Sequence, residues 1–161
     1  MKIIAHRANL FGPMEESEND PLMVDKCIEM GFDVEIDLWF DKNKQQFLLG
    51  HDKGEYSIDL GWILERKKSL WIHCKGTESI LKISEMATDL NYFWHNKDDY
   101  TFTSKGIIWA YPGNVVNEIG VLVMPEWANE RLESQNVDSC YGICTDYPIK
   151  IKESWLNNEK T

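Results

Sequence analysis

The sequence lacks any long uninterrupted apolar run, so it offers no segment that is expected to span a bilayer. A secretory signal is also missing, because the chain passes from Lys2 directly into Ile3-Ile4-Ala5 without the longer apolar region and cleavage site of a signal peptide. These two absences predict a cytoplasmic protein that does not insert stably into a membrane.

Cysteine is scarce, and the four residues are Cys27, Cys74, Cys140 and Cys144. Their spacing matches none of the common zinc-binding patterns. In a chain without a secretion signal, such cysteines are expected to be reduced, buried thiols. The sequence therefore favours neither disulfides nor a cysteine-based zinc site.

Basic residues are outnumbered, since 17 Lys and Arg stand against 27 Asp and Glu and the formal net charge is −10. This balance argues against nucleic acid or an anionic membrane surface as the main partner, because both require basic patches. A small phosphorylated substrate stays compatible with the charge, because a bound cation and a few basic side chains can reverse the field inside a cleft.

The chain also lacks linkers, repeats and low-complexity segments, and its 161 residues suffice for one domain, 1–161, with a real core. Aromatic residues, by contrast, are abundant, with seven Trp, six Tyr and six Phe. Some of these rings are expected in the core, and others in the walls of a concave site, for which Trp39, Trp109, Tyr111 and Trp127 are candidates.

Short apolar, β-branched and aromatic runs predict strands at Lys2–Ala5, Asp33–Trp39, Gln46–Gly50, Leu70–Cys74, Tyr92–Trp94, Ile107–Ala110, Val121–Met124 and Tyr141–Cys144. Helical spacing predicts helices at Pro21–Met30, Thr77–Leu90 (with Thr77 as N-cap) and Ala128–Ser134. Loops or hairpins are expected at Asp41–Lys44 and Asn96–Lys105, and a polar, partly loose tail at Ile149–Thr161.

The alternation of strands and helices in the first half indicates parallel strands joined by crossovers. We therefore expect an α/β fold, a reduced TIM-like (β/α) barrel. Because a complete barrel of this kind takes about 250 residues, some connecting helices must be missing. Strand surface left bare in this way makes a homodimer a further expectation.

Reactive side chains gather where the predicted strands end, namely His6, Arg7, His51, Asp52, His73, Lys75, His95, Glu126 and Asp146. Glu35 and Asp37 are two residues apart on one strand and so face the same side. Active sites of parallel barrels lie at the carboxyl ends of the strands. Two carboxylates inside a barrel need a cation or hydrogen-bond donors, and a hard divalent ion suits them.

Simpler interpretations exist for each of these residues taken alone. His6 and Arg7 could form a capping pair with a surface salt bridge. Glu35 and Asp37 could lie on the solvent-facing side of a half-exposed strand. His73 and His95 could be structural histidines.

Taken in order, Ile4-Ala5-His6-Arg7, Glu18-Asn19, Val34-Glu35-Ile36-Asp37 and Gly50-His51-Asp52 resemble the motifs of the glycerophosphodiester phosphodiesterase family. Its members are phospholipase C-like phosphodiesterases with a TIM-barrel fold. The segment Tyr141–Pro148 resembles the last barrel strand and exit turn of that family. The resemblance covers about the first third of the chain and its end, and the middle matches loosely.

The resemblance implies a role for each matching residue. His6 and His51 match the catalytic general acid and base, in an order that the sequence leaves open. The phosphate-binding and substrate-side positions are matched by Arg7, Lys75 and Asn19. Glu35 and Asp37 match ligands of Mg²⁺ or Ca²⁺.

The sequence also departs from the family pattern. His73 stands two residues before Lys75, where the family has a third metal carboxylate, and an imidazole ligand shifts the preference towards Mn²⁺ or Zn²⁺. Alternatively, Glu126 supplies the missing oxygen or metal binding is weak. Ala8 replaces the usual glycine after His-Arg. The segment between Lys75 and Thr145 is too short for the usual helices and insertion, so a more open pocket is expected.

These observations predict metal-dependent hydrolysis of a small, glycerophosphodiester-like phosphodiester by two-histidine acid/base catalysis. Two alternatives stay open. One is a catalytically weak barrel that binds a phosphorylated ligand, and the other is a lyase that releases a cyclic phosphate.

Overall fold

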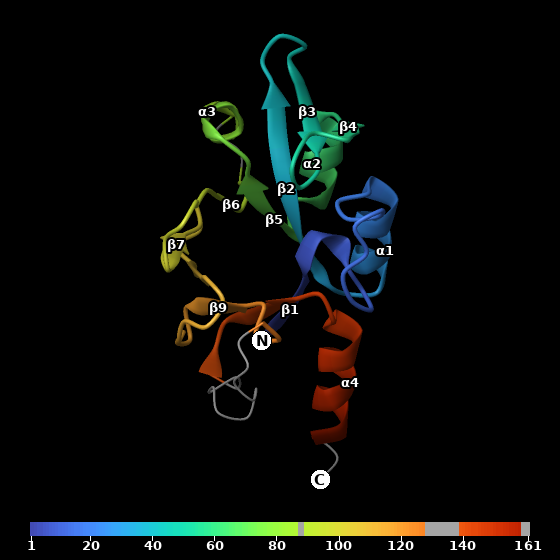
Figure 1. Cartoon of the computed structure of the whole chain (residues 1–161), viewed down its shortest axis with the longest axis vertical. Coiled ribbons are helices and arrows are strands. Elements are labelled where there is room, and N and C mark those ends of the chain that lie inside the picture. The colour runs from blue at the N-terminus through green and yellow to red at the C-terminus, as the bar shows by residue number, and fades with distance from the viewer. Residues whose placement is uncertain (87–88, 128–138, 159–161) are drawn as a thin grey trace.

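The computed structural model describes residues 1–86, 89–127 and 139–158, and it shows a mixed α/β fold whose ten-stranded sheet curls into a half-barrel (Figure 1). The strands are β1 (Lys2–Ala5), β2 (Asp33–Asp41), β3 (Gln46–Leu49), β4 (Tyr56–Ile58), β5 (Leu70–Cys74), β6 (Tyr92–Phe93), β7 (Tyr100–Phe102), β8 (Ile108–Ala110), β9 (Gly120–Val123) and β10 (Gly142–Thr145). The helices are the 3-10 turn η1 (His6–Ala8), α1 (Pro21–Glu29), α2 (Leu60–Arg66), α3 (Thr77–Glu85) and α4 (Pro148–Asn158). Among the helices of these ranges, none is both long enough and apolar enough for a bilayer crossing.

Parallel strands form the body of the sheet, in the spatial order β6-β5-β2-β1-β10-β9-β8. Their carboxyl ends therefore meet at one end of the curled sheet. The long strand β2 pairs with β1 over Asp33–Val34 and, further along, with β3 over Leu38–Asp41. β3 is antiparallel to β2, so it runs back from the hairpin and ends beside Leu38, near the carboxyl ends of the parallel strands.

The two flanks of the curl meet at β6 and β8 without a regular strand ladder in the described residues. Ser104 bridges this gap, since its backbone N–H donates to the carbonyl of Tyr92 at 2.7 Å and its hydroxyl accepts from the Tyr92 N–H at 3.0 Å. The rings of Phe93 and Trp109 face each other across the gap at 4.6 Å between centroids. One backbone hydrogen bond and side-chain contacts, rather than a strand ladder, thus join the two flanks.

Alternation along β2 decides which residues face the interior. Val34, Ile36 and Leu38 belong to the apolar cluster that packs against α1, α2 and α3, so they point outwards. Glu35 and Asp37 therefore point inwards. Below them, the inside of the curl is filled by a second apolar cluster of Ile4, Trp71, Phe93, Trp109, Val121, Val123, Met124 and Cys144.

The predicted strands are confirmed with ends shifted by at most two residues, and the Asp41–Lys44 turn closes the β2–β3 hairpin as expected. Because of this hairpin, β3 is not one of the parallel strands. The Asn96–Lys105 segment is a hairpin arm, with β7 antiparallel to β8. The short elements β4 and α2 had not been predicted, and Asp59, which accepts from the Trp62 N–H, was the available N-cap signal.

The helix predicted at Thr77–Leu90 needs two corrections. The N-cap of α3 is Gly76 rather than Thr77, and the helix ends at Glu85 although Leu90 was expected to belong to it. Leu90 satisfies the apolar spacing because it is buried in the core outside any helix. The helix predicted at Ala128–Ser134 lies outside the described residues.

The described part of the C-terminal tail is not loose, because Pro148–Asn158 form α4, the red helix next to the C-terminus in Figure 1. Although the helix is mostly polar, two of its residues attach it to the core, because Ile149 and Ile151 pack against different apolar clusters. Lys152 adds a third attachment, donating to the Met30 carbonyl at 3.0 Å and lying 5.0 Å from the ring centroid of Phe32. Cys27, Cys74 and Cys144 are buried free thiols as predicted, and Cys140 is buried as well.

Candidate active site

The polar residues at the strand ends meet around one cavity of about 520 Å³. Its polar wall consists of His6, Arg7, Glu35, His51, His73 and Lys75. His51 reaches this wall through the β2–β3 hairpin, because the Gly50 N–H donates to the Asp37 carbonyl at 3.2 Å and thereby ends β3 beside the middle of β2. Residues on or just after β1, β2, β3 and β5 thus converge at one place.

A buried acidic pair lies at this wall: Glu35 lines the cavity, and Asp37 contacts its lining residues Arg7, His73 and Lys75. Glu35 and Asp37 are 2% and 1% exposed, so the interpretation of a solvent-facing strand is wrong. In the parallel register, Asp37 lies opposite His73 on β5. The His73 Nδ1 atom lies 3.1 Å from Asp37 Oδ1 and 3.7 Å from Glu35 Oε1. These three residues offer ligand atoms that lie within 4.8 Å of one another, as a metal site requires.

The two carboxylates differ in their electrostatic surroundings. Burial and the charge of Asp37 raise the pKa of Glu35 above its usual value. Burial alone would also raise the pKa of Asp37, but the hydrogen bond with His73 and the charges of Lys75 and Arg7 lower it well below its usual range. Asp37 is therefore the firmly ionised member of the pair. At Glu35 the neighbouring positive charges do not outweigh burial and the charge of Asp37.

Asn19 acts on Asp37 rather than on the cavity. Its side chain is completely buried and is absent from the cavity wall. The Asn19 amide donates to Asp37 Oδ2 at 3.1 Å, and its oxygen accepts the Asp37 N–H at 2.8 Å. Asn19 was expected to contact substrate, but the structure places it behind Asp37, where it holds that carboxylate in position.

Arg7 and Lys75 supply the positive charge of the wall. The Arg7 Nε atom lies 3.2 Å and the Lys75 Nζ atom 3.3 Å from Asp37. Arg7 also donates from Nη1 to Glu18 at 3.0 Å. The Arg7 and Ala8 backbones both have positive φ, 50° and 64°, a conformation that glycine adopts more readily. This turn aims the Arg7 N–H at Glu35 Oε2, 3.1 Å away.

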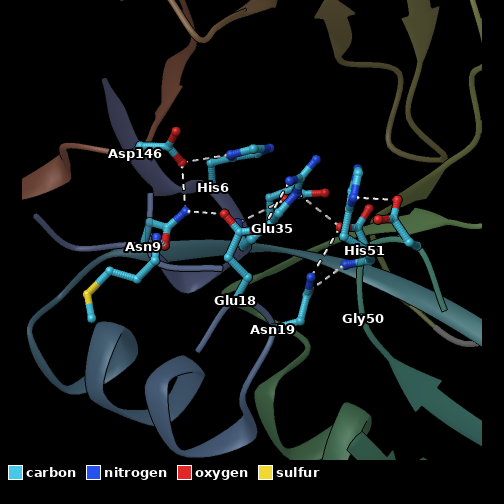
Figure 2. Close-up of polar contacts among 12 residues, drawn as sticks. His6, Asn9, Glu18, Asn19, Glu35, Gly50, His51 and Asp146 are labelled. Atoms are coloured by element: carbon cyan, nitrogen blue, oxygen red, sulfur yellow. Dashed lines mark hydrogen bonds and ion pairs between the residues drawn. The ribbon is translucent and has the colours of Figure 1, made fainter. Parts of the chain in front are cut away.

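His6 is held by a buried carboxylate from the far end of the chain. Its Nδ1 atom lies 2.8 Å from Asp146 Oδ1, which also accepts from the Asn9 side chain at 2.8 Å (Figure 2). Burial alone would lower the pKa of His6, but the Asp146 hydrogen bond and the charge of Glu35 raise it above its usual value. His6 is 8% exposed, so it is not part of a surface capping pair.

Glu126 supports Asp146 instead of the acidic pair. One carboxylate oxygen of Glu126 accepts from the Thr145 hydroxyl at 2.8 Å and from the Asp146 N–H at 2.9 Å. Among the described residues, the group that could hold a metal contains His73 and not Glu126. The structure therefore favours His73 over Glu126 as the third member.

His51 is the most exposed of the polar residues in the wall, with a side chain that is 41% accessible. Its Nδ1 atom lies 2.8 Å from Asp52 Oδ1. Partial burial and the positive charge of Arg7 lower the pKa of His51 below its usual value. The pKa values of the two histidines expected to act as acid and base, His6 and His51, are thus shifted in opposite directions.

The rest of the cavity lining is mostly aromatic and apolar, and it includes Trp109 and Trp127, which were predicted there. Trp94 and His95 also line it and were not predicted as site residues. His95 stacks on His73, with ring centroids 4.7 Å apart and planes 7° from parallel. Burial and the nearby charge on His73 lower the pKa of His95 to about 4, so it is neutral at pH 7.

Asn9, Asp146 and Glu18 complete the site without having been assigned to it from the sequence. Asp146 and Glu18 had signals, since Asp146 follows a strand end and Glu18 belongs to a recognised motif. Asn9 had none, because only the fold brings it between Glu18 Oε1, 3.0 Å away, and Asp146.

Comparison with protein-family models, curated proteins and solved structures found nothing that matches this chain. The assignment of a function therefore depends on the chemistry of the site itself.

Proposed function

We propose that this chain is a divalent-metal-dependent phosphodiesterase, built on a reduced TIM-like (β/α) barrel related to the glycerophosphodiester phosphodiesterases. The observation that carries the proposal is the convergence of His6, Arg7, Glu35, His51, His73 and Lys75 on one cavity, where Asp37 completes a candidate metal group with Glu35 and His73. Acids, bases, cations and a candidate metal site are together the requirements of phosphodiester cleavage.

The acidic group fits a divalent cation on its own chemistry. Glu35 and Asp37 are almost completely buried and carry like charges, which is unfavourable unless a cation offsets them. Glu35, Asp37 and His73 would be the protein ligands, and the nitrogen ligand favours Mn²⁺ or Zn²⁺ over the Mg²⁺ or Ca²⁺ that the family resemblance implies. A bound ion would supply positive charge against the phosphate oxygens.

Arg7 and Lys75 would hold the phosphate. Both line the cavity and lie beside Asp37, so a phosphate bound between them would face the acidic group. The planar guanidinium suits two phosphate oxygens at once. Their charges would also offset the negative charge that grows in the transition state.

His6 would be the general acid and His51 the general base. His6 is oriented by the buried Asp146, and it holds its proton more tightly than a free histidine because its pKa is raised. His51 has a lowered pKa and an accessible side chain, so it is neutral at pH 7 and can accept a proton from water or a substrate hydroxyl.

The test is turnover of glycerophosphocholine with Mn²⁺, Zn²⁺, Mg²⁺ or Ca²⁺, followed by phosphorus NMR. We expect metal-dependent turnover, falling about 10²–10⁴-fold in His6→Ala and His51→Ala, as for other general acid–base residues. Glu35→Gln is expected to abolish the increase in turnover that added metal produces. Glu78→Gln, at an exposed position, serves as the matched control and should keep that increase.

The products distinguish the candidate functions. A monoester as the final product supports the hydrolase, and accumulation of a cyclic phosphate supports the lyase. Binding of the diester with no product under any metal supports the phosphate-binding barrel instead. Full activity in both histidine variants would refute the assigned roles.

A further inference from the structure

The cavity has two chemically distinct halves. Its charged half comes from β1, β2, β3 and β5, the first half of the chain. The other half comes from the ends of β6, β8 and β9 and consists mostly of Trp94, Trp109, Tyr111, Pro112, Val123, Met124 and Trp127. A substrate that touches both halves has an anionic part and an apolar part side by side.

Three rings of the apolar half lie at its mouth with their surfaces open. Trp94, Tyr111 and Trp127 are 45%, 48% and 58% exposed. They come from the ends of three different strands, yet all line the same cavity. Large aromatic surfaces left in water are unfavourable, and their gathering at one mouth indicates a ligand that covers them.

A fourth ring of the cavity lining, Trp109, is buried and packed against other rings. Trp109 is 4% exposed and lies between Phe93 and Trp71, with ring centroids 4.6 Å and 5.7 Å away. Near the charged half, the Trp127 ring meets the His6 ring edge to face at 6.4 Å. The aromatic half therefore begins directly beside one of the proposed catalytic groups.

We propose that the aromatic half is a specificity pocket for a flat ring carried by one alcohol of the phosphoester; this rests on the phosphate site proposed above. Glycerol is small and carries hydroxyl groups, so it would leave the rings of Trp94 and Tyr111 exposed to solvent. A flat ring stacks on such faces and gains more than its buried area alone provides. The volume of about 520 Å³ has room for a ring next to a phosphate.

The experiment measures binding of three phosphomonoesters to the full chain by calorimetry: methyl, cyclohexyl and phenyl phosphate. Phenyl phosphate is expected to bind at least about tenfold more tightly than methyl phosphate, from its buried apolar area. It is also expected to exceed cyclohexyl phosphate, which has similar area but no flat face.

Variants locate the effect. Trp94→Leu and Tyr111→Leu are expected to reduce the ratio of phenyl to methyl affinity towards one. Both side chains are about half exposed, so their replacement removes little from the core. Phe102→Leu is the matched control, because Phe102 is 65% exposed and does not line the cavity. It is expected to keep the wild-type ratio.

Each outcome decides a different point. Equal affinity for methyl and phenyl phosphate overturns the pocket while leaving the phosphate site in place. Cyclohexyl phosphate binding as tightly as phenyl phosphate overturns the preference for a flat ring. An unchanged ratio in both leucine variants also overturns the pocket. Failure of all three compounds to bind refutes the phosphate site, and the specificity pocket with it.

Discussion

Replacing Asn19 by alanine tests the interaction that holds Asp37. The substitution removes the donor to Asp37 Oδ2 and leaves the buried Asp37 N–H without its acceptor. Losing a hydrogen bond to a charged group costs about 1.5–3 kcal/mol, and an unsatisfied buried N–H about 1–3 kcal/mol. Asn19 also has φ 63°, a left-handed conformation that costs a residue such as alanine about 1–2 kcal/mol.

Because such contributions overlap, we expect Asn19→Ala to lower the free energy of unfolding by about 3–5 kcal/mol, a large part of the ~5–15 kcal/mol that a domain of this kind possesses. Urea unfolding followed by circular dichroism measures this loss. Asn43→Ala, at an exposed position in the β2–β3 turn, is the matched control and should change stability by less than about 0.5 kcal/mol. A loss below about 1 kcal/mol in Asn19→Ala would show that Asp37 does not depend on this clamp.

Three further predictions concern the titratable groups. Glu35→Gln removes a charge that burial and Asp37 disfavour, so its metal-free Tm should equal or exceed that of the wild type while the rise in Tm with Mn²⁺ disappears; a lower Tm in chelator would contradict this. Asp146→Asn should lower the pKa of His6 in an NMR titration. Protonated His6 stabilises the fold at low pH, and this contribution, which is lost as the pH rises through the folded-state pKa of His6, should be smaller in the variant. An unchanged pKa would exclude the role of Asp146. The pKa of His95 is lowered from 6.5 to about 4, so the unfolded chain takes up this proton first and stability falls as the pH drops from about 6.5 towards 4. Between pH 7 and 5, in chelator, the free energy of unfolding of His95→Phe should therefore fall by about 1 kcal/mol less than that of the wild type, a magnitude reduced to account for solvent screening of this partly exposed group. Parallel curves of stability against pH would refute this.

Local pattern was sufficient for the strands of the site. The alternation Val34-Glu35-Ile36-Asp37-Leu38 has period two, so one side of β2 had to be apolar and the other acidic, and the structure has that arrangement. The same rule applies to His73 on β5 and to Lys75, the first residue after that strand. Chemistry at strand ends was predictable because parallel strands share one carboxyl end.

Prediction failed where a residue's environment comes from elsewhere in the chain. Asn19 was expected on the substrate side because its motif position says nothing about the direction of its side chain. The tail at 149–161 was expected to be loose because its polar sequence does not reveal that Ile149 and Ile151 reach the core. Leu90 continued a helical spacing while packing into the core from outside a helix.

The sequence by itself determined which residue types stand at the ends of the strands, because a two-residue period and the neighbouring turns are local properties. Only the tertiary structure decided which of them meet. His6 and Asp146 are 140 residues apart in the chain and form their hydrogen bond only because β1 and β10 are neighbours in the sheet. The same is true of the two halves of the cavity, since charge from the first strands and aromatic rings from the later ones share a surface only once the sheet has curled.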